Sequence, residues 1–390
     1  KRQVGARLCA ALVDNPPEPA VTPPPQYGAT SPVKIKRSVF GLTRRCLNRL
    51  ITRRARFVGR SILDPAKMTR SRVFATTVLR GSTMRELTGY LMEIDWHAGQ
   101  IKAKLPIALD EADPFWGERG GNRGGRGMAV HDGTLYLAMA LSIKKFNRDL
   151  ECIGELRHPL IAGCHEIYAE CDGLWVTSTI HDLIVKVDYD GNIMTTWYGS
   201  ESAELQRTLN VHPRKLNVSL EFPNDDFVEA YNRYCDDIQL HLNTVCVWDG
   251  HTYALSCRKN AFIRIWPSPE RLVFHDFALG APHNGIITSD GQVVVNDTQN
   301  QCIRLYDLVS GKRQKILHTP VYAERGKTSY FATAGWQRGL AHVEGSRYLV
   351  GTSPATVFEV DIARNQVGQI CILDDDVRHC IHGLFVAEDF

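Results

Sequence analysis

The chain has 390 residues, of which 44% are hydrophobic and 31 are glycine. A chain of this length can bury a large core, and its glycine content suits a turn-rich protein built from β-strands. The formal net charge of +3 is too small to indicate a nucleic-acid partner for the whole chain. No apolar run approaches the roughly 18 residues that a membrane-spanning helix needs, so the sequence predicts no transmembrane segment.

The sequence contains 11 cysteines, an odd number, and no Cys-x-x-Cys pair. Several of them, including Cys246 and Cys302, fall inside predicted strands, where a free thiol behaves as a small apolar residue. This usage favours a reducing compartment, and we therefore expect a cytoplasmic protein.

Residues 1–71 are expected to form an extension outside the folded domain. Residues 1–33 are proline-rich and are expected to be extended, whereas residues 34–60 carry many basic side chains and no acidic one, with a partial apolar stripe that favours some helix. Three interpretations fit the basic run: a targeting segment, an arm that docks on an anionic membrane or nucleic acid, or sequence upstream of the functional start.

From Arg126 onward, one pattern recurs about every 40 residues. Each copy begins with a short apolar strand, continues with a turn made of an acidic residue and glycine, and ends with further strands. Repeats of three or four short strands predict the blades of a β-propeller. The acidic residues of the turns are Asp132, Asp172, Asp249, Asp290 and Glu344.

The two ends of the chain are expected to complete one another. The last copy begins at His382 and stops after one strand, while residues 72–81 and 88–96 are predicted strands that lack a first strand of their own. Joining them in one blade closes the ring and removes the exposed edge of a linear array. We predict an all-β, six-bladed β-propeller over residues 72–390 with this velcro closure.

Residues 199–240 interrupt the repeat. They show no strand alternation and are polar with helical tendency, so we expect an insertion that caps one face of the ring. A degenerate seventh blade hidden in this segment is the alternative.

The first strand of each copy lines the channel of a propeller, so residues that enter these strands converge at one face. Four copies are entered by histidine and two by arginine: His165, His241, His283 and His382, and Arg126 and Arg338. Neutral imidazole is the commonest protein ligand for Zn, Fe and Cu, which predicts a metal site. The alternative is that each histidine bonds a backbone carbonyl. The two arginines are expected to bind a small anionic molecule.

One copy carries a family resemblance. HNGIITSDGQVVVNDTQNQCIRLYD, residues 283–307, resembles the blade consensus of NHL-type propellers and of the SMP-30/gluconolactonase and strictosidine synthase-like group. The resemblance implies a divalent cation on Asn284 and Asp297, with Glu166 and Asn243 as weaker matches, and such oxygen ligands suit Ca²⁺ or Mg²⁺. Adjacent strand residues point to opposite sides, so an all-histidine site and this oxygen-rich site compete.

These features predict a small-molecule enzyme with a metal-assisted site in its channel, either hydrolase/lactonase-like or oxygenase-like. Carotenoid-cleavage oxygenases are similar only in placing four histidines on inner strands. The alternative is a non-catalytic interaction module with structural histidines, which would bind a protein partner through the insertion. The glycine-rich residues 117–127 are expected to form a loop at the channel mouth, and no serine or cysteine hydrolase signature is present.

Overall fold

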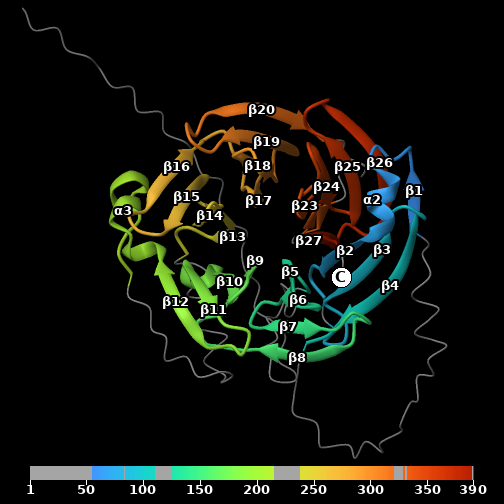
Figure 1. Ribbon diagram of the computed structural model, residues 1–390, viewed down its shortest axis with the longest axis horizontal. Helices are drawn as coiled ribbons and strands as arrows, with labels where there is room; N and C mark the ends of the chain where they lie inside the picture. The colour runs from blue at the N-terminus through green and yellow to red at the C-terminus, as the bar shows by residue number, and fades with distance from the viewer. Residues whose placement is uncertain are drawn as a thin grey trace, which may run out of the picture. The chain divides into compact units, whose positions relative to one another are not determined.

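The computed structural model describes residues 55–82, 84–109, 124–214, 238–319, 328–329, 332–388 and 390. Six antiparallel sheets of four or five strands stand around a central channel as the blades of a propeller (Figure 1). The predicted six-bladed propeller is therefore confirmed. No helix of the described residues is both long and apolar enough to cross a membrane.

Five blades each contain four strands that are consecutive in the sequence, and the first of these strands lies innermost. Blades 2 and 3 contain β5 (Met128–His131), β6 (Thr134–Ala138), β7 (Ile143–Phe146) and β8 (Cys152–Leu156), then β9 (Ile167–Glu170), β10 (Gly173–Ser178), β11 (Leu183–Val187) and β12 (Ile193–Tyr198). Blades 4 and 5 contain β13 (Leu242–Trp248), β14 (His251–Ser256), β15 (Ala261–Trp266) and β16 (Arg271–His275), then β17 (His283–Ile287), β18 (Gln292–Asp297), β19 (Cys302–Asp307) and β20 (Arg313–His318). Blade 6 contains β23 (Leu340–Glu344), β24 (Arg347–Thr352), β25 (Thr356–Asp361) and β26 (Gln366–Ile372).

Blade 1 is built from both ends of the chain. Its inner strand β27 (His379–Glu388) pairs with β2 (Ser71–Leu79), which is followed outward by β3 (Gly89–Asp95) and β4 (Gln100–Ile107). The register between β27 and β2 runs from Ser71 opposite Glu388 to Leu79 opposite His379. The predicted closure is confirmed, and the closing strand begins at His379 rather than at His382.

The recurring acidic-Gly turns connect the inner strand of a blade to the second strand. Asp132 and Gly133 both have positive φ, at 44° and 66°, and Asp249 and Gly250 have φ of 49° and 71°. Two successive residues with positive φ match the twist of a tight hairpin, and aspartate and glycine tolerate that conformation best. The turn chemistry therefore sets where each inner strand ends.

The core lies between neighbouring blades. Six clusters of buried apolar side chains fill the space between the sheets. Between blades 1 and 2, for example, Phe74 and Leu91 pack with Leu135 and Leu137, all fully buried. Because each blade buries both faces, removing one blade would expose apolar surface on both of its neighbours.

The described chain joins the propeller before residue 72. Strand β1 (Arg56–Val58) pairs with β26 as a fifth strand of blade 6, and helix α2 (Pro65–Arg70) leads into β2. Leu63 and Met68 are buried between blades 1 and 6. The sequence assigns residues 55–71 to the extension because a three-residue strand inside a basic run shows no alternation. Residues 1–54, with the proline-rich part and most of the basic run, lie outside the described residues.

A buried carboxylate fixes this N-terminal segment. Glu359 on β25 is fully buried and accepts hydrogen bonds from the backbone N–H groups of Ile62 and Gln369, at 2.7 and 3.0 Å. It also accepts from the Ser61 hydroxyl and from Trp96 Nε1, each at 2.5 Å. Glu359 thus joins the N-terminal segment, blade 1 and blade 6.

The insertion is described in part. Helix α3 (Ala203–Leu209) is capped at its start by the Ser202 side chain and packs Leu205 and Leu209 into the core between blades 3 and 4. It lies at the outer edge of the ring beside β16 (Figure 1). Residues 215–237, which carry most of the predicted cap, lie outside the described residues. The short strands β21 (Thr328–Ser329) and β22 (Ala332–Thr333) form a separate hairpin.

Deleting residues 382–390 should abolish cooperative unfolding, because it removes most of β27 and leaves β2 as an unpaired edge in an open ring. Thermal unfolding followed by circular dichroism measures this effect. Deletion of residues 1–52, which lie outside the described residues, is the control and should leave the midpoint within about 1 °C, because a loss of about 1 kcal/mol would shift the midpoint of a domain this large by about 1–2 °C. An unchanged midpoint in the C-terminal deletion would contradict the role of closure.

Replacing Glu359 with alanine should lower the free energy of unfolding by about 3 kcal/mol, because it leaves buried N–H donors without an acceptor. Urea unfolding measures the change. Glu204→Ala is the matched control, because the carboxylate of Glu204 pairs with the exposed Arg207 on α3, and loss of such a pair should cost less than about 0.5 kcal/mol. Equal losses in the two variants would disprove the anchoring role.

Candidate functional site

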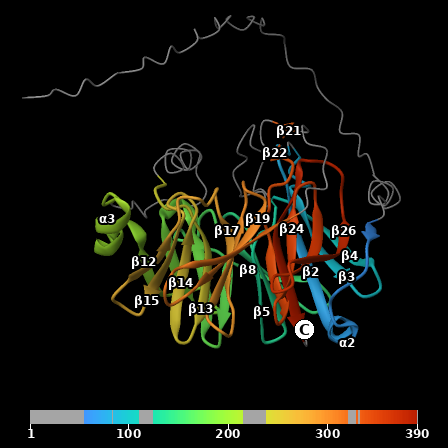
Figure 2. The same ribbon diagram turned by 90° about the horizontal axis from the view of Figure 1, so that it is seen from above.

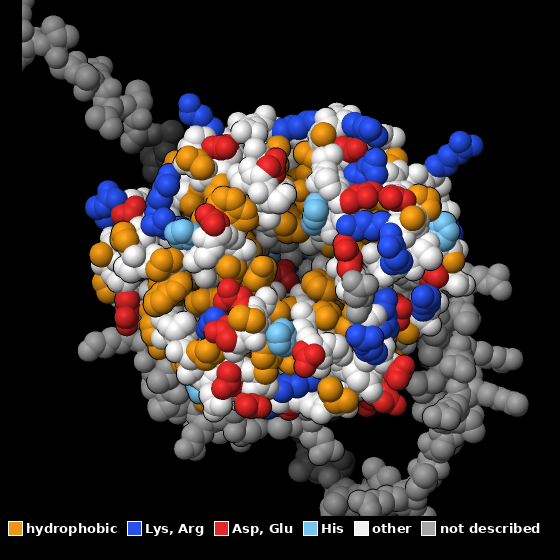
Figure 3. Space-filling view, viewed as in Figure 1, with side chains coloured by type: hydrophobic (Ala, Val, Ile, Leu, Met, Phe, Trp, Pro, Cys, Tyr) orange, Lys and Arg blue, Asp and Glu red, His pale blue; other side chains and the backbone are white. Residues whose placement is uncertain are grey.

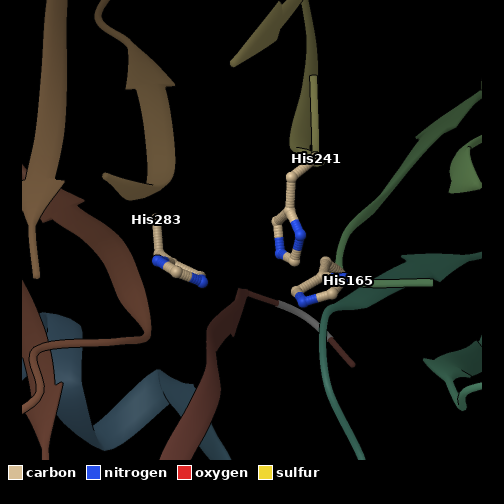
Figure 4. Close-up of side chains that lie close together, drawn as sticks. All are labelled: His165, His241 and His283. Carbon is tan, nitrogen blue, oxygen red and sulfur yellow. The ribbon is translucent and has the colours of Figure 1, made fainter. Parts of the chain in front are cut away.

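The structure gathers the four predicted histidines around the channel axis. Ring centroids lie 5.0 Å apart for His165 and His241, 5.3 Å for His165 and His382, and 6.1 Å for His165 and His283. His283 lies 6.4 Å from His382. Figure 4 shows three of the rings turned toward a common point from blades 3, 4 and 5. The convergence that the repeat predicts is present, whereas metal binding remains a prediction.

Three of the histidines lie close enough to share one ion. His165, His241 and His283 each offer a ring nitrogen, and these nitrogens lie within 4.8 Å of one another. With ligand distances of 2.0–2.1 Å, two nitrogens on a tetrahedral ion are about 3.4 Å apart. Ring movements of about 1 Å would therefore bring them onto one ion.

The hydrogen bonds of His283 fix its tautomer. Its Nδ1 lies 2.9 Å from the Ala281 carbonyl and 3.1 Å from Thr298 Oγ1. The Thr298 hydroxyl donates its proton to the Gln337 carbonyl at 2.9 Å, so both groups around Nδ1 are acceptors. Nδ1 must therefore carry the proton, and Nε2 keeps its lone pair. That Nε2 atom is buried and has no hydrogen-bond partner.

His165 repeats this arrangement two blades away. Its Nδ1 lies 2.8 Å from the Gly163 carbonyl and 2.9 Å from Thr179 Oγ1, and Thr179 donates to the Leu242 carbonyl of the next blade. The alternative expectation, that each histidine bonds a backbone carbonyl, thus describes the Nδ1 of His165 and His283, whereas the Nδ1 of His382 is buried without a hydrogen-bond partner. Arg126 Nη1 also lies 3.3 Å from the Nδ1 of His165. For His283, a protonated Nδ1 bonded to a carbonyl is the usual arrangement of metal-ligating histidines.

Burial and nearby charges favour the neutral state of three histidines of the cluster. Burial lowers the pKa of His165, His283 and His382 well below the ordinary value, and neighbouring guanidinium groups lower it further. Arg126 acts on His165, and Arg338 acts on His283 and His382. Neutral imidazole is the form that binds metals.

Both predicted arginines lie beside the cluster. Arg126 is buried and donates from Nη1 to the carbonyls of Gly163, at 3.1 Å, and Cys164. Burial lowers the pKa of Arg338 to about 9, and the charge of Arg80 contributes. Arg126 thus also supports the loop that holds His165, whereas Arg338 carries a charge that its surroundings destabilise.

Sequence reasoning missed Arg80. It follows β2, the second strand of blade 1, and therefore does not occupy an inner-strand entry position. Its guanidinium carbon lies 4.9 Å from the Trp336 ring centroid, and that of Arg338 lies 5.2 Å from the same centroid. Both arginines contact one tryptophan because closure of the ring places the end of β2 beside blade 6. The sequence alone does not indicate this contact.

Of the oxygen ligands implied by the family resemblance, Glu166 and Asn284 lie together, Asn243 keeps a buried Oδ1 without a hydrogen-bond partner, and Asp297 is engaged elsewhere. Glu166 and Asn284 bond to one another across the channel at 2.8 Å, and Asn243 donates to the Pro282 carbonyl at 2.8 Å. Asp297 is fully buried inside blade 5, where its carboxylate accepts from the Gly280 N–H at 2.7 Å and pairs with Arg304 at 2.5 Å. Within the described ranges, the only group of His, Cys, Asp and Glu ligands close enough to share an ion is the histidine one.

The glycine-rich loop is described only from residue 124 onward, where it enters blade 2. A side-chain carbon on Gly127 would lie 2.0 Å from Glu166 Oε1, so glycine is required for the Glu166 side chain to lie there. Residues 117–123 lie outside the described residues.

No family model matches the chain, and no curated protein matches it. A protein of unknown function from Bacteroides caccae is similar in structure, with a TM-score of 0.50 and 12% identity over 82% of this chain and 100% of its own. A chain of a nidogen/laminin complex has a TM-score of 0.50 and 12% identity over 81% and 98%. Virginiamycin B lyase from Staphylococcus aureus has a TM-score of 0.43 and 12% identity over 81% and 87%. At 12% identity, the likeness to the first two of these structures shows the fold alone.

The neutral histidines predict a stability that falls in mild acid. Above pH 6.5 the histidines are neutral in the folded protein and in the unfolded chain. Below pH 6.5 the histidines of the unfolded chain take up protons, whereas those of the folded cluster do not. Each histidine then removes about 1.4 kcal/mol of unfolding free energy per pH unit, down to its own folded pKa. Urea unfolding at several pH values, with a chelator present, measures the slope.

His283→Gln isolates one of these contributions from the carboxylates that also titrate in acid. It should reduce the slope below pH 6.5 by about 1.4 kcal/mol per pH unit. His318→Gln, at an exposed position on β20, is the matched control for the loss of one histidine outside the channel. A slope that is the same in both variants would mean that His283 is protonated as readily in the folded state as in the unfolded chain.

Proposed function

We propose that the protein is a small-molecule enzyme that binds a divalent transition-metal ion in its channel through His165, His241 and His283, with His382 beside them. The observation that carries this proposal is the buried Nε2 of His283, which has no partner and faces the rings of the other histidines. A desolvated acceptor without a partner costs about 1–3 kcal/mol, and a bound ion would remove that cost.

Three imidazole nitrogens suit a metal ion that is intermediate between hard and soft in its ligand preference. Three neutral nitrogens leave at least one coordination position open on a tetrahedral ion, as in catalytic zinc sites, and they also suit Fe and Cu. When bound, such an ion polarises a carbonyl group or lowers the pKa of a water molecule. The Nδ1 hydrogen bonds of His165 and His283 would hold those rings in the ligating orientation.

The arginines favour an anionic substrate. The lowered pKa of Arg338 reflects a buried guanidinium near other positive groups, and a carboxylate or phosphate would balance that charge. Arg80 and Arg338 lie 4.9 and 5.2 Å from the Trp336 ring centroid, and both of them and Arg126 act on the histidines through their charge. We therefore favour metal-assisted hydrolysis of an anionic ester or lactone, a reaction that needs only carbonyl polarisation and an anion anchor. Bound Fe or Cu would instead favour an oxygenase-like reaction.

Metal analysis tests the proposal directly. The purified full chain, dialysed without chelator, should contain about one Zn, Fe or Cu per chain by mass spectrometry, and His283→Ala should reduce this to near zero. His318→Ala, at the exposed end of β20, is the control and should keep the wild-type content. Wild-type protein that binds none of these metals, even after their addition, would refute the enzyme proposal and favour the interaction module.

A further inference from the structure

A second cavity occupies the channel on the side away from the histidine cluster. It is walled by the inner strands of all six blades, β5, β9, β13, β17, β23 and β27, and has a volume of about 400 Å³. Figure 3 looks into this hollow from the face where β27 ends, the lower face in Figure 2. Hydrophobic side chains gather around it, and an acidic side chain is visible at its bottom.

The lining of the cavity is about equally apolar and polar. Met128 and Val130 of blade 2, Ile286 of blade 5, and Leu384 and Phe385 of blade 1 are among the lining residues. Pockets of roughly 300–1,000 Å³ with apolar walls and a few polar groups are typical of small-molecule sites. The volume therefore suits a ligand with a hydrocarbon part.

Glu166 is the only Asp or Glu of the cavity lining. Its Oε2 accepts a hydrogen bond from Asn284 at 2.8 Å, and Asn284 in turn accepts from the Gly339 N–H at 2.7 Å. These bonds hold the carboxyl group at the end of the cavity, against Gly127 of the neighbouring blade. Among the described residues, no Lys, Arg or His nitrogen lies within ion-pair distance of Glu166.

We propose that this cavity is a second binding site, which takes an amphiphilic amine with its ammonium group on Glu166 and its hydrocarbon part against the inner strands. A carboxyl group in an apolar site without a counter-ion is stabilised most by a ligand that brings the opposite charge. A carboxylate ligand would bring a second acidic group and no positive charge, and an alcohol would supply only a neutral hydrogen bond. An alkylammonium offers both the charge and the apolar area.

The site does not depend on the proposed metal chemistry. Glu166 and Asn284 occupy the next layer along the axis from His165 and His283, and the cavity opens on the other face of the ring. Binding of an amine and metal content are therefore separate measurements, and either can fail alone.

Calorimetric titration of the full chain at one fixed pH tests the proposal with three probes of equal length: n-octylammonium, 1-octanol and octanoate. The expected order of affinity is ammonium, then alcohol, then carboxylate. Shortening the amine from octyl to butyl should weaken binding by about fourfold per methylene group, the loss expected for apolar burial. This probe series on the unmodified protein needs no variant to fold.

Glu166→Gln then isolates the charge while keeping the size of the side chain. It should weaken n-octylammonium binding at least tenfold and leave 1-octanol binding within about twofold. Glu155→Gln, on the outer strand β8 and away from the cavity, is the matched control and should bind all probes as the wild type does. Equal affinity of the wild type for n-octylammonium and 1-octanol, or unchanged amine binding in Glu166→Gln, would overturn the proposal.

Discussion

The pairing of β27 with β2 is the constraint on which the rest of the structure depends, because it fixes six inner strands around one axis. At its centre, a bulge beside Thr76 lets one hydroxyl serve two blades. Thr76 Oγ1 accepts from the Gly383 N–H at 2.9 Å and donates to the Arg126 carbonyl at 2.8 Å. A side-chain carbon on Gly383 would lie 2.0 Å from that carbonyl, so the closure needs glycine. His382 and Arg126 are thereby placed beside one another.

Hydrogen bonds between neighbouring blades also orient two of the histidines. Thr179 and Thr298 each contact the Nδ1 of a histidine in their own blade and donate to a carbonyl of the following blade. The orientation of each ring therefore depends on the packing between two blades. A change far from the channel that loosens this packing would also disturb the cluster.

Much of this arrangement could be predicted from the sequence, because it follows from repetition. A repeated acidic-Gly turn fixes the register of each inner strand, so equivalent residues such as His165 and His283 must meet near the axis. The incomplete last copy likewise required a partner strand from the other end. The convergence of the histidines and the closure of the ring both follow from the repeat alone. Neither prediction requires a known contact between segments that are not copies of the repeat.

The remaining features depend on such contacts and could not be predicted in this way. Arg80 reaches the site only because its strand closes the ring. Asp297 matches a ligand position in sequence, but Arg304, seven residues later, neutralises it inside the blade. The attachment of β1 rests on Glu359, about 300 residues away in the chain, and no periodicity indicates an interaction of that kind.

The hydrogen bond between Glu166 and Asn284 crosses from blade 3 to blade 5 and lies between the two ends of the channel. His165 belongs to the histidine cluster and Glu166 to the lining of the cavity, and these two residues are consecutive in the chain. A substitution at either residue therefore acts on the same peptide unit, so the effects of a double substitution are expected to differ from the sum of the two single ones.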